Sequence, residues 1–246
     1  MNTEIHLSVC RDVRKMPLVN HTSLLDKGAE KIRSMVINQG QFGRRCYFCD
    51  FSFGSWDGFE VHNLDGDHTN QTQDNLVPVC ELCHLPFHLD LLGRKWPGDK
   101  VSRGKIIYLP EMSQVELNNL LQAVFFSMAM QTDAGISVKP EEADKGVQSL
   151  GAHIVYNRLH NRSKYVECNS LGEVIRPALS DPYVLSKVLV DMDDETYGQR
   201  AELLKGFRYL APSEHFVRQA QFWNANGSAF SRLDLASWKG IAGVAE

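Results

Sequence analysis

The spacing of hydrophobic residues predicts a strand and then a helix in the N-terminal part of the chain. Ile5, Leu7 and Val9 occupy every second position, and a period of two is typical of a strand. Apolar residues at helical spacing follow over residues 25–38, and the pattern stops before Gly40, a residue type that commonly ends helices. We therefore expect both kinds of element before residue 40.

The middle of the chain predicts a strand, a turn, a second strand and a helix. Residues 59–64 are expected to form a short strand, and the Asp65-Gly66 pair that follows is a strong turn signal. Residues 75–79 give the returning strand. A helix is expected over 80–92, where Pro86 is tolerable only within the first turn. The chain should therefore double back on itself within this stretch.

The second half is expected to be mainly helical. Ser113 and Glu116 form a capping box, in which each residue satisfies a backbone N–H at the start of a helix. The helix that follows is apolar nearly all round past Leu120, so we expect it to be buried. A brief strand is expected at 106–109 and a linker at 131–146. Further helices are expected at about 155–165, 182–189 and 194–210, and a last one from Ser213. Asp181-Pro182 would begin the helix at 182–189, and Ser213 would cap the last one.

Length and composition are those of an ordinary globular protein. The chain has 246 residues, of which 43% are hydrophobic. It contains no run of about eighteen apolar residues and no signal peptide, so a cytoplasmic protein is expected. In a reducing compartment, closely spaced cysteines are more often metal ligands than disulfides.

Two Cys-x-x-Cys pairs, Cys46/Cys49 and Cys80/Cys83, carry the strongest chemical signal in the sequence. Four thiolates at this spacing suit one tetrahedral Zn²⁺, and a closed shell of four sulfurs indicates a structural metal rather than a catalytic one. The alternative is a set of buried thiols without metal, but two such pairs flanking a hairpin rarely arise for packing alone. Cys10 and Cys168 remain as spare thiols.

The charge balance argues against nucleic-acid binding. The whole chain has a net charge of −4. Residues 40–104 hold six Lys or Arg against nine Asp or Glu, which gives 6 − 9 = −3 for the region around the cysteines. Proteins that bind nucleic acids draw most of their affinity from Lys and Arg contacts to phosphates. We therefore expect no nucleic-acid partner.

The stretch around the cysteines resembles the HNH endonuclease fold. The resemblance is carried by Val61-His62-Asn63-Leu64-Asp65-Gly66, Asp74-Asn75-Leu76 and Cys80-x-x-Cys83-His84. It implies that His62 takes a metal-ligand position, Asn75 that of the family asparagine and His84 that of the last histidine. Asn63 then stands where the family has its general base.

An asparagine at the general-base position argues against nuclease activity. An HNH nuclease needs an imidazole to take a proton from the attacking water beside a divalent cation, and a carboxamide cannot do this. His68 stands beyond the turn and is not expected to point into the same site. We interpret the chain as a degenerate, non-catalytic HNH-like protein, with an active HNH-type metal-dependent endonuclease as the alternative. Whether His62, His84 and His88 bind a second metal stays open.

The chain also resembles, along most of its length, the IcmJ (DotN) family of the Dot/Icm type IVB secretion system. The resemblance is carried by Cys46, Cys49, Asn63-Leu64-Asp65-Gly66, Asn75-Leu76-Val77, Cys80-x-x-Cys83 and Ile107-Tyr108-Leu109-Pro110-Glu111 with the Leu-rich helix after it. This family shows an asparagine at the general-base position, so Asn63 is expected there.

The second resemblance implies a non-catalytic, zinc-containing adaptor subunit of the type IVB coupling complex. Such a subunit would bind the C-terminal extension of the coupling ATPase (DotL), contact other subunits and help to recruit effector proteins. It would be cytoplasmic, peripheral to the inner membrane through the secretion complex, with no direct membrane insertion.

These observations together predict an α+β protein: an HNH-like, zinc-bound ββα unit followed by a mainly helical C-terminal half. The predicted division is an HNH-like zinc-binding domain over 1–110, a helical region over 111–225 and a flexible tail over 226–246.

Overall fold

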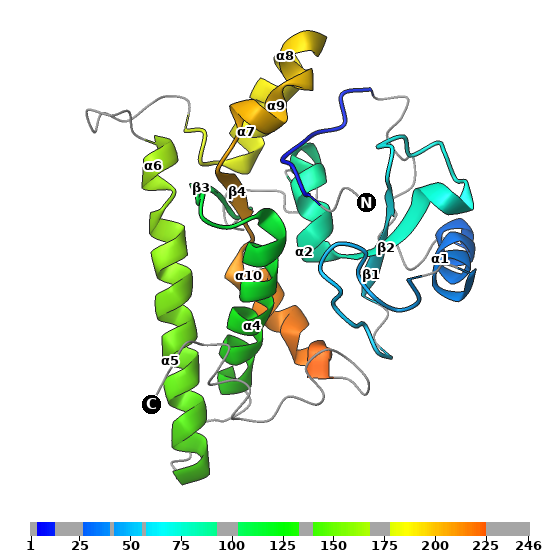
Figure 1. Ribbon diagram of the computed structural model, residues 1–246. Helices are drawn as coiled ribbons and strands as arrows, with labels where there is room; N and C mark the ends of the chain where they lie inside the picture. The colour runs from blue at the N-terminus through cyan, green and yellow to red at the C-terminus, as the bar shows by residue number, and fades with distance from the viewer. Residues whose placement is uncertain are drawn as a thin grey trace.

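The computed structural model describes residues 4–12, 27–39, 42–55, 58–92, 103–132, 140–167 and 178–224. The predicted tail at 226–246 and the spare thiol Cys168 lie outside these ranges. Helices and short strands together confirm the predicted α+β class (Figure 1). The α-helices are α1 (Lys27–Gln39), α2 (Glu81–His84), α4 (Gln114–Thr132), α5 (Pro140–Asn161), α6 (Lys164–Glu167), α7 (Pro182–Asp191), α8 (Asp194–Gly198), α9 (Arg200–Leu203) and α10 (Ser213–Ala220).

The strands β1 (Phe59–Asn63) and β2 (Leu76–Cys80) form an antiparallel pair, as the turn signal between them predicts. Phe59 lies opposite Cys80, and Asn63 lies opposite Leu76. Gly66 has a φ of +72° in the connecting loop, a backbone conformation that glycine adopts without strain. Every residue of both strands is buried. The pair therefore lies inside the molecule rather than at its surface.

The helix predicted over 80–92 is much shorter than expected. Only α2 is α-helical, and the 3₁₀ turns η3 (Leu85–Phe87) and η4 (Leu89–Leu91) follow it. Pro86 lies inside η3 and has no N–H to donate, so an α-helix could not continue through it without losing a hydrogen bond. The chain tightens there into separate turns.

The N-terminal segment is buried as the alternation predicts, but the strand prediction is wrong. Ile5, Leu7 and Val9 are all buried. Their backbone pairs with no strand among the described residues. It bonds instead to the 3₁₀ region: the Ser8 N–H donates to the Pro86 carbonyl at 2.9 Å, and Leu89 N–H donates to the Ser8 carbonyl at 3.2 Å. The alternation of apolar residues therefore predicted which side chains are buried, but it did not predict which segment forms hydrogen bonds with this backbone.

A second antiparallel pair joins distant parts of the chain. The strand β3 (Lys105–Tyr108), expected at 106–109, pairs with β4 (Phe207–Leu210). The sequence predicted one helix over 194–210, which is wrong because α8 and α9 end before Gly206. Gly206 has a φ of +82°, which turns the chain into β4. The hydrogen bonds gained with β3 outweigh local helix propensity here.

The helix α4 is buried along most of its length and contacts α2, α5, α10 and β4. Its capping box is present as predicted: Ser113 N–H donates to Glu116 Oε2 at 2.7 Å, and Glu116 N–H donates to Ser113 Oγ at 3.2 Å. In Figure 1, α4 lies beside the long helix α5. The α5 helix begins at Pro140, so the linker predicted over 131–146 is partly wrong.

The capping residue predicted for α7 is confirmed, and the one predicted for α10 is wrong. Asp181 caps α7, because its Oδ1 accepts from the Tyr183 N–H at 2.8 Å, and Pro182 takes the first helical position. At α10 the capping position belongs to Pro212, and Ser213 is the first helical residue.

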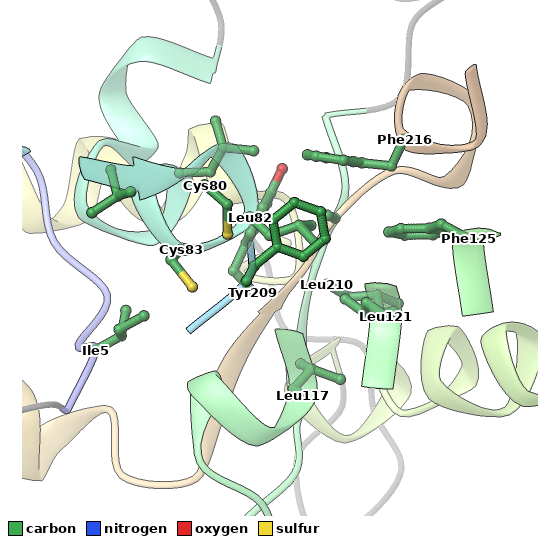
Figure 2. Close-up of a cluster of buried hydrophobic side chains, with 14 of the residues drawn as sticks. Ile5, Cys80, Leu82, Cys83, Leu117, Leu121, Phe125, Tyr209, Leu210 and Phe216 are labelled. Atoms are coloured by element: carbon green, nitrogen blue, oxygen red, sulfur yellow. The ribbon is translucent and has the colours of Figure 1, made fainter. Parts of the chain in front are cut away.

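One continuous hydrophobic core joins the cysteine region to the helices. Figure 2 shows Leu82 of α2 together with Leu117 and Leu121 of α4 and Tyr209 of β4. Phe125 and Phe216 extend it toward α10, with their rings stacked at 5.5 Å between centroids (Figure 2). The hairpin is therefore held against the helical half by packing as well as by polar contacts.

Candidate metal centre

All four cysteines of the two Cys-x-x-Cys pairs meet at one point. Their sulfur atoms lie within 4.8 Å of one another, and Cys49 Sγ lies 3.6 Å from Cys80 Sγ. Four sulfurs at about 2.3 Å from a tetrahedral Zn²⁺ would be about 3.8 Å apart. The donor set and its spacing therefore fit a zinc ion.

Local backbone geometry positions the first pair of cysteines, Cys46 and Cys49. The Arg45–Ser52 bridge closes a short loop, within which the Cys46 N–H donates to the Phe51 carbonyl at 2.9 Å. Asp50 has a φ of +59°, which lets the chain reverse directly after Cys49. The second pair comes from the end of β2 and from α2, so secondary structure places both of its sulfurs.

Burial of Cys46, Cys80 and Cys83 opposes the joint ionisation of these three thiols without a cation. Burial raises the pKa of Cys80 and of Cys83 well above the ordinary thiol value. At Cys46 burial acts in the same direction, but hydrogen bonds from the three other cysteines outweigh it and lower the pKa. Thiolates are the metal-binding form, and a divalent cation stabilises several of them at once.

Two carboxamides of α4 reach these sulfurs, and neither was predicted from the sequence. Asn118 Nδ2 donates to Cys83 Sγ at 3.3 Å, and Gln122 Nε2 donates to Cys49 Sγ at 3.3 Å. Both side chains are buried. The sequence feature that could have revealed them is their spacing of one helical turn on an otherwise apolar helix face.

A second cluster contains His62 of β1, His84 of α2 and His88, all buried. One ring nitrogen from each lies within 4.8 Å of those of the other two. His62 Nδ1, His84 Nε2 and both nitrogens of His88 find no hydrogen-bond partner among the residues that the structure describes. Burial lowers the pKa of His62 and of His88 well below the ordinary value, which favours the neutral, metal-binding form. These imidazoles fit a metal site of nitrogen donors.

Aromatic side chains enclose the histidine cluster. Phe87 stacks on His62 at 4.4 Å between ring centroids, and Phe48 lies edge-on to His62 at 5.8 Å. His68 lies beside the cluster, with its ring centroid 5.0 Å from that of His88, but it is not among the three histidines whose ring nitrogens converge.

The loop that carries His68 curls back because two asparagines hold it. Asn63 Nδ2 donates to the carbonyls of Asp67 and Asn70 at 3.1 and 2.8 Å. Asn75 Oδ1 accepts from the Asp65 N–H at 3.0 Å, and its Nδ2 donates to Asp65 Oδ1 at 2.9 Å. Both amides therefore use their N–H groups to fix the loop.

None of the helices in the described ranges is both long enough and apolar enough to cross a membrane.

No family model matches the chain. It is 30% identical over 181 residues to the type 4 apparatus protein DotN of Legionella pneumophila, strain Philadelphia 1. The alignment covers 74% of this chain and 73% of that protein. With identity and coverage at this level, and as the sequence resemblance predicts, the chain belongs to the DotN (IcmJ) family of the Dot/Icm secretion apparatus.

Proposed function

We propose that this chain is a non-catalytic, zinc-containing adaptor subunit of the type IVB secretion coupling complex. The observation that carries the proposal is the cluster of four cysteine sulfurs within 4.8 Å, in a member of a secretion-apparatus family. Cys46, Cys49, Cys80 and Cys83 would hold one Zn²⁺. Four sulfurs fill its coordination shell and leave no position for a reacting water, so the metal would stabilise the fold.

The proposed partner is the C-terminal segment of a DotL-like coupling ATPase, with other coupling-complex subunits beside it. In this role the chain would aid effector recruitment from the cytoplasmic side, peripheral to the inner membrane through the complex. Support comes from the name of the Legionella relative, an apparatus protein. The acidic balance of the cysteine region supports a protein partner rather than a nucleic acid.

We propose the division of the chain stated above: an HNH-like zinc-binding domain over 1–110, a helical region over 111–225 and a tail over 226–246. The order β1, β2, α2 supports an HNH-derived unit in the first of these.

The second candidate function is an HNH-type, metal-dependent endonuclease, and the cluster of His62, His84 and His88 is the observation that favours it. We propose that a divalent cation binds there, at a residual HNH site that also includes Asn63 and Asn75. Asn63 supplies no base, because a carboxamide does not take up a proton near neutral pH. Its N–H groups donate instead to the Asp67 and Asn70 carbonyls. A nuclease at this site would have to take its base from another residue, so we rank this candidate below the adaptor.

The adaptor proposal is tested by co-expressing the chain with the C-terminal segment of the coupling ATPase from the same bacterium. We expect the two to co-purify as a stoichiometric complex that contains zinc. Co-purification should be lost when Cys80→Ser removes a zinc ligand and kept in Cys10→Ser. A wild-type chain that holds zinc and does not bind the segment would overturn the adaptor role.

The nuclease alternative is tested by incubating plasmid DNA with the purified chain and Mg²⁺, Mn²⁺ or Ni²⁺. We expect no nicking above a no-protein control. Metal-dependent cleavage that His84→Ala abolishes would replace the adaptor proposal with the nuclease.

A further inference from the structure

Three buried carboxamides lie in a row on α4. Gln114, Asn118 and Gln122 are four residues apart, so they project from the same side of the helix. Their exposed fractions are 2%, 1% and 6%, in a helix whose other buried positions are mostly apolar. Buried amides cost free energy unless they are hydrogen-bonded, so their partners indicate why the row is there.

The row connects β4 to the cysteine sulfurs. Gln114 Nε2 donates to the Tyr209 carbonyl and to Asn118 Oδ1, both at 2.9 Å, and its Oε1 accepts from the Tyr209 N–H at 2.8 Å. Because Gln114 occupies the oxygen of Asn118, the N–H groups of Asn118 are directed toward α2. There they donate to the Leu82 carbonyl at 3.0 Å and to Cys83 Sγ at 3.3 Å.

Gln122 donates to sulfurs on the other side of the cysteine cluster. Its Nε2 lies 3.3 Å from Cys49 Sγ and 3.9 Å from Cys80 Sγ, so it donates to one cysteine of each Cys-x-x-Cys pair. Together with Asn118, it gives three of the four sulfurs an N–H donor from α4.

These donors match what a buried tetrathiolate site needs. Four thiolates around Zn²⁺ leave two negative charges in excess, and burial makes that charge costly. A donated N–H takes up part of the charge on each sulfur and fixes its direction. Replacing a group that orients metal ligands in this way typically lowers metal affinity by about 10- to 100-fold.

We propose that Asn118 and Gln122 are positioning residues of the cysteine zinc site. They hold the thiolates of Cys49, Cys80 and Cys83 through N–H···S hydrogen bonds, so a helix from the second half of the chain sets the metal affinity of ligands in the first half. This inference rests on the proposed zinc site. It also makes metal loading and the docking of α4 against α2 mutually dependent.

The test compares Gln122→Met and Asn118→Leu with Asn119→Leu. The first two keep side-chain volume and remove the donors, while Asn119 is the exposed neighbour on the same helix. Zinc affinity is measured by competition with a chromogenic chelator. We expect a loss of about 10- to 100-fold in Gln122→Met and Asn118→Leu and none in Asn119→Leu.

A spectroscopic readout separates a bond to sulfur from simple packing. In the Co²⁺-substituted protein, the sulfur-to-metal charge-transfer band should move to lower energy when a donor is lost, because the thiolate then holds more electron density. Packing alone would not move this band. If Gln122→Met does not fold, Asn118→Leu carries the test alone, through the same affinity and the same band.

Two negative outcomes are distinct. A wild type that binds one zinc, with donor variants that match Asn119→Leu in both affinity and band position, overturns this inference alone. A wild type that binds no zinc at its cysteines overturns the proposed site and this inference with it.

Discussion

The carboxylate of Glu60 lies 2.5 Å from Nδ1 of His84, and both side chains are buried. The hydrogen bond occupies Nδ1 and leaves Nε2 as the nitrogen of His84 that is available to a metal. A carboxylate that orients a histidine in this way recurs at metal sites, where it raises the basicity of the ligand. The pair therefore supports metal binding at the histidine cluster, beside the cysteine site.

Glu60→Gln should weaken that second site. The amide keeps the shape of the side chain but loses the charge that orients the imidazole, so we expect divalent-metal affinity to fall by about 10- to 100-fold. The measurement is calorimetric titration of Ni²⁺ into protein whose cysteine site already holds zinc. Glu202→Gln, at an exposed residue of α9, is the control. Equal affinities in both variants, or no binding by the wild type, would contradict the prediction.

Features set by neighbouring residues could be predicted from the sequence. The capping box of Ser113 and Glu116, the cap at Asp181 and the turn at Gly66 each depend on a few adjacent positions, and the structure has all three. The spacing of the cysteine pairs likewise indicated that the four sulfurs come together.

Features set by distant residues could not be predicted. The β4 strand exists because β3, about a hundred residues earlier, offers it a partner, and its local sequence favoured a helix. His68 reaches His88 only because Asn63 and Asn75 fold the intervening loop back. The one-turn spacing of Asn118 and Gln122 indicates a shared face of α4, but their contacts with sulfur depend on how α4 packs against α2.

Cys80→Ser should remove zinc and unfold the hairpin region. Structural zinc contributes about 10–16 kcal/mol to folding in small zinc-finger peptides, and a hydroxyl is a poor replacement for a thiolate. We expect insoluble protein, or soluble protein with no bound zinc and a broad thermal transition followed by circular dichroism. Cys10→Ser, at a half-buried thiol outside the cluster, should behave as wild type. A folded, zinc-free Cys80→Ser protein with the wild-type melting temperature would refute a structural metal.

Gly206→Ala should destabilise the turn into β4. The residue has a φ of +82°, and an added Cβ would lie 2.7 Å from Tyr108 Cε2 and 3.2 Å from Pro110 Cβ. The left-handed backbone alone costs a residue with a Cβ about 1–2 kcal/mol, so we expect at least that loss in the free energy of unfolding by urea. Gly198→Ala is the matched control, because nothing lies within 4 Å of a Cβ there. Equal stability of the two variants would show that the turn tolerates a side chain.

Glu81 of α2 joins the cysteine region to α10 by polar contacts. Both of its carboxylate oxygens lie 3.1 Å from His215 Nε2, and Gln219 Nε2 donates to Oε2 at 2.7 Å. The carboxylate is buried and next in sequence to Cys80, a proposed zinc ligand. Hydrogen bonds to a buried charge contribute about 1.5–3 kcal/mol, so this contact should resist separation of the two parts.

We expect Glu81→Gln to lower the free energy of unfolding by about 1–3 kcal/mol, since the amide offers a single uncharged acceptor to two donors. Urea denaturation of the zinc-loaded protein measures the loss, and Glu214→Gln, at the exposed neighbour of His215, is the control. A double-mutant cycle with Gln219→Leu isolates the contact itself, because residues that share a hydrogen bond show coupling of about 0.5–3 kcal/mol. Strictly additive effects of the two substitutions would mean that α10 is held by its apolar face, through Phe216, and not by Glu81.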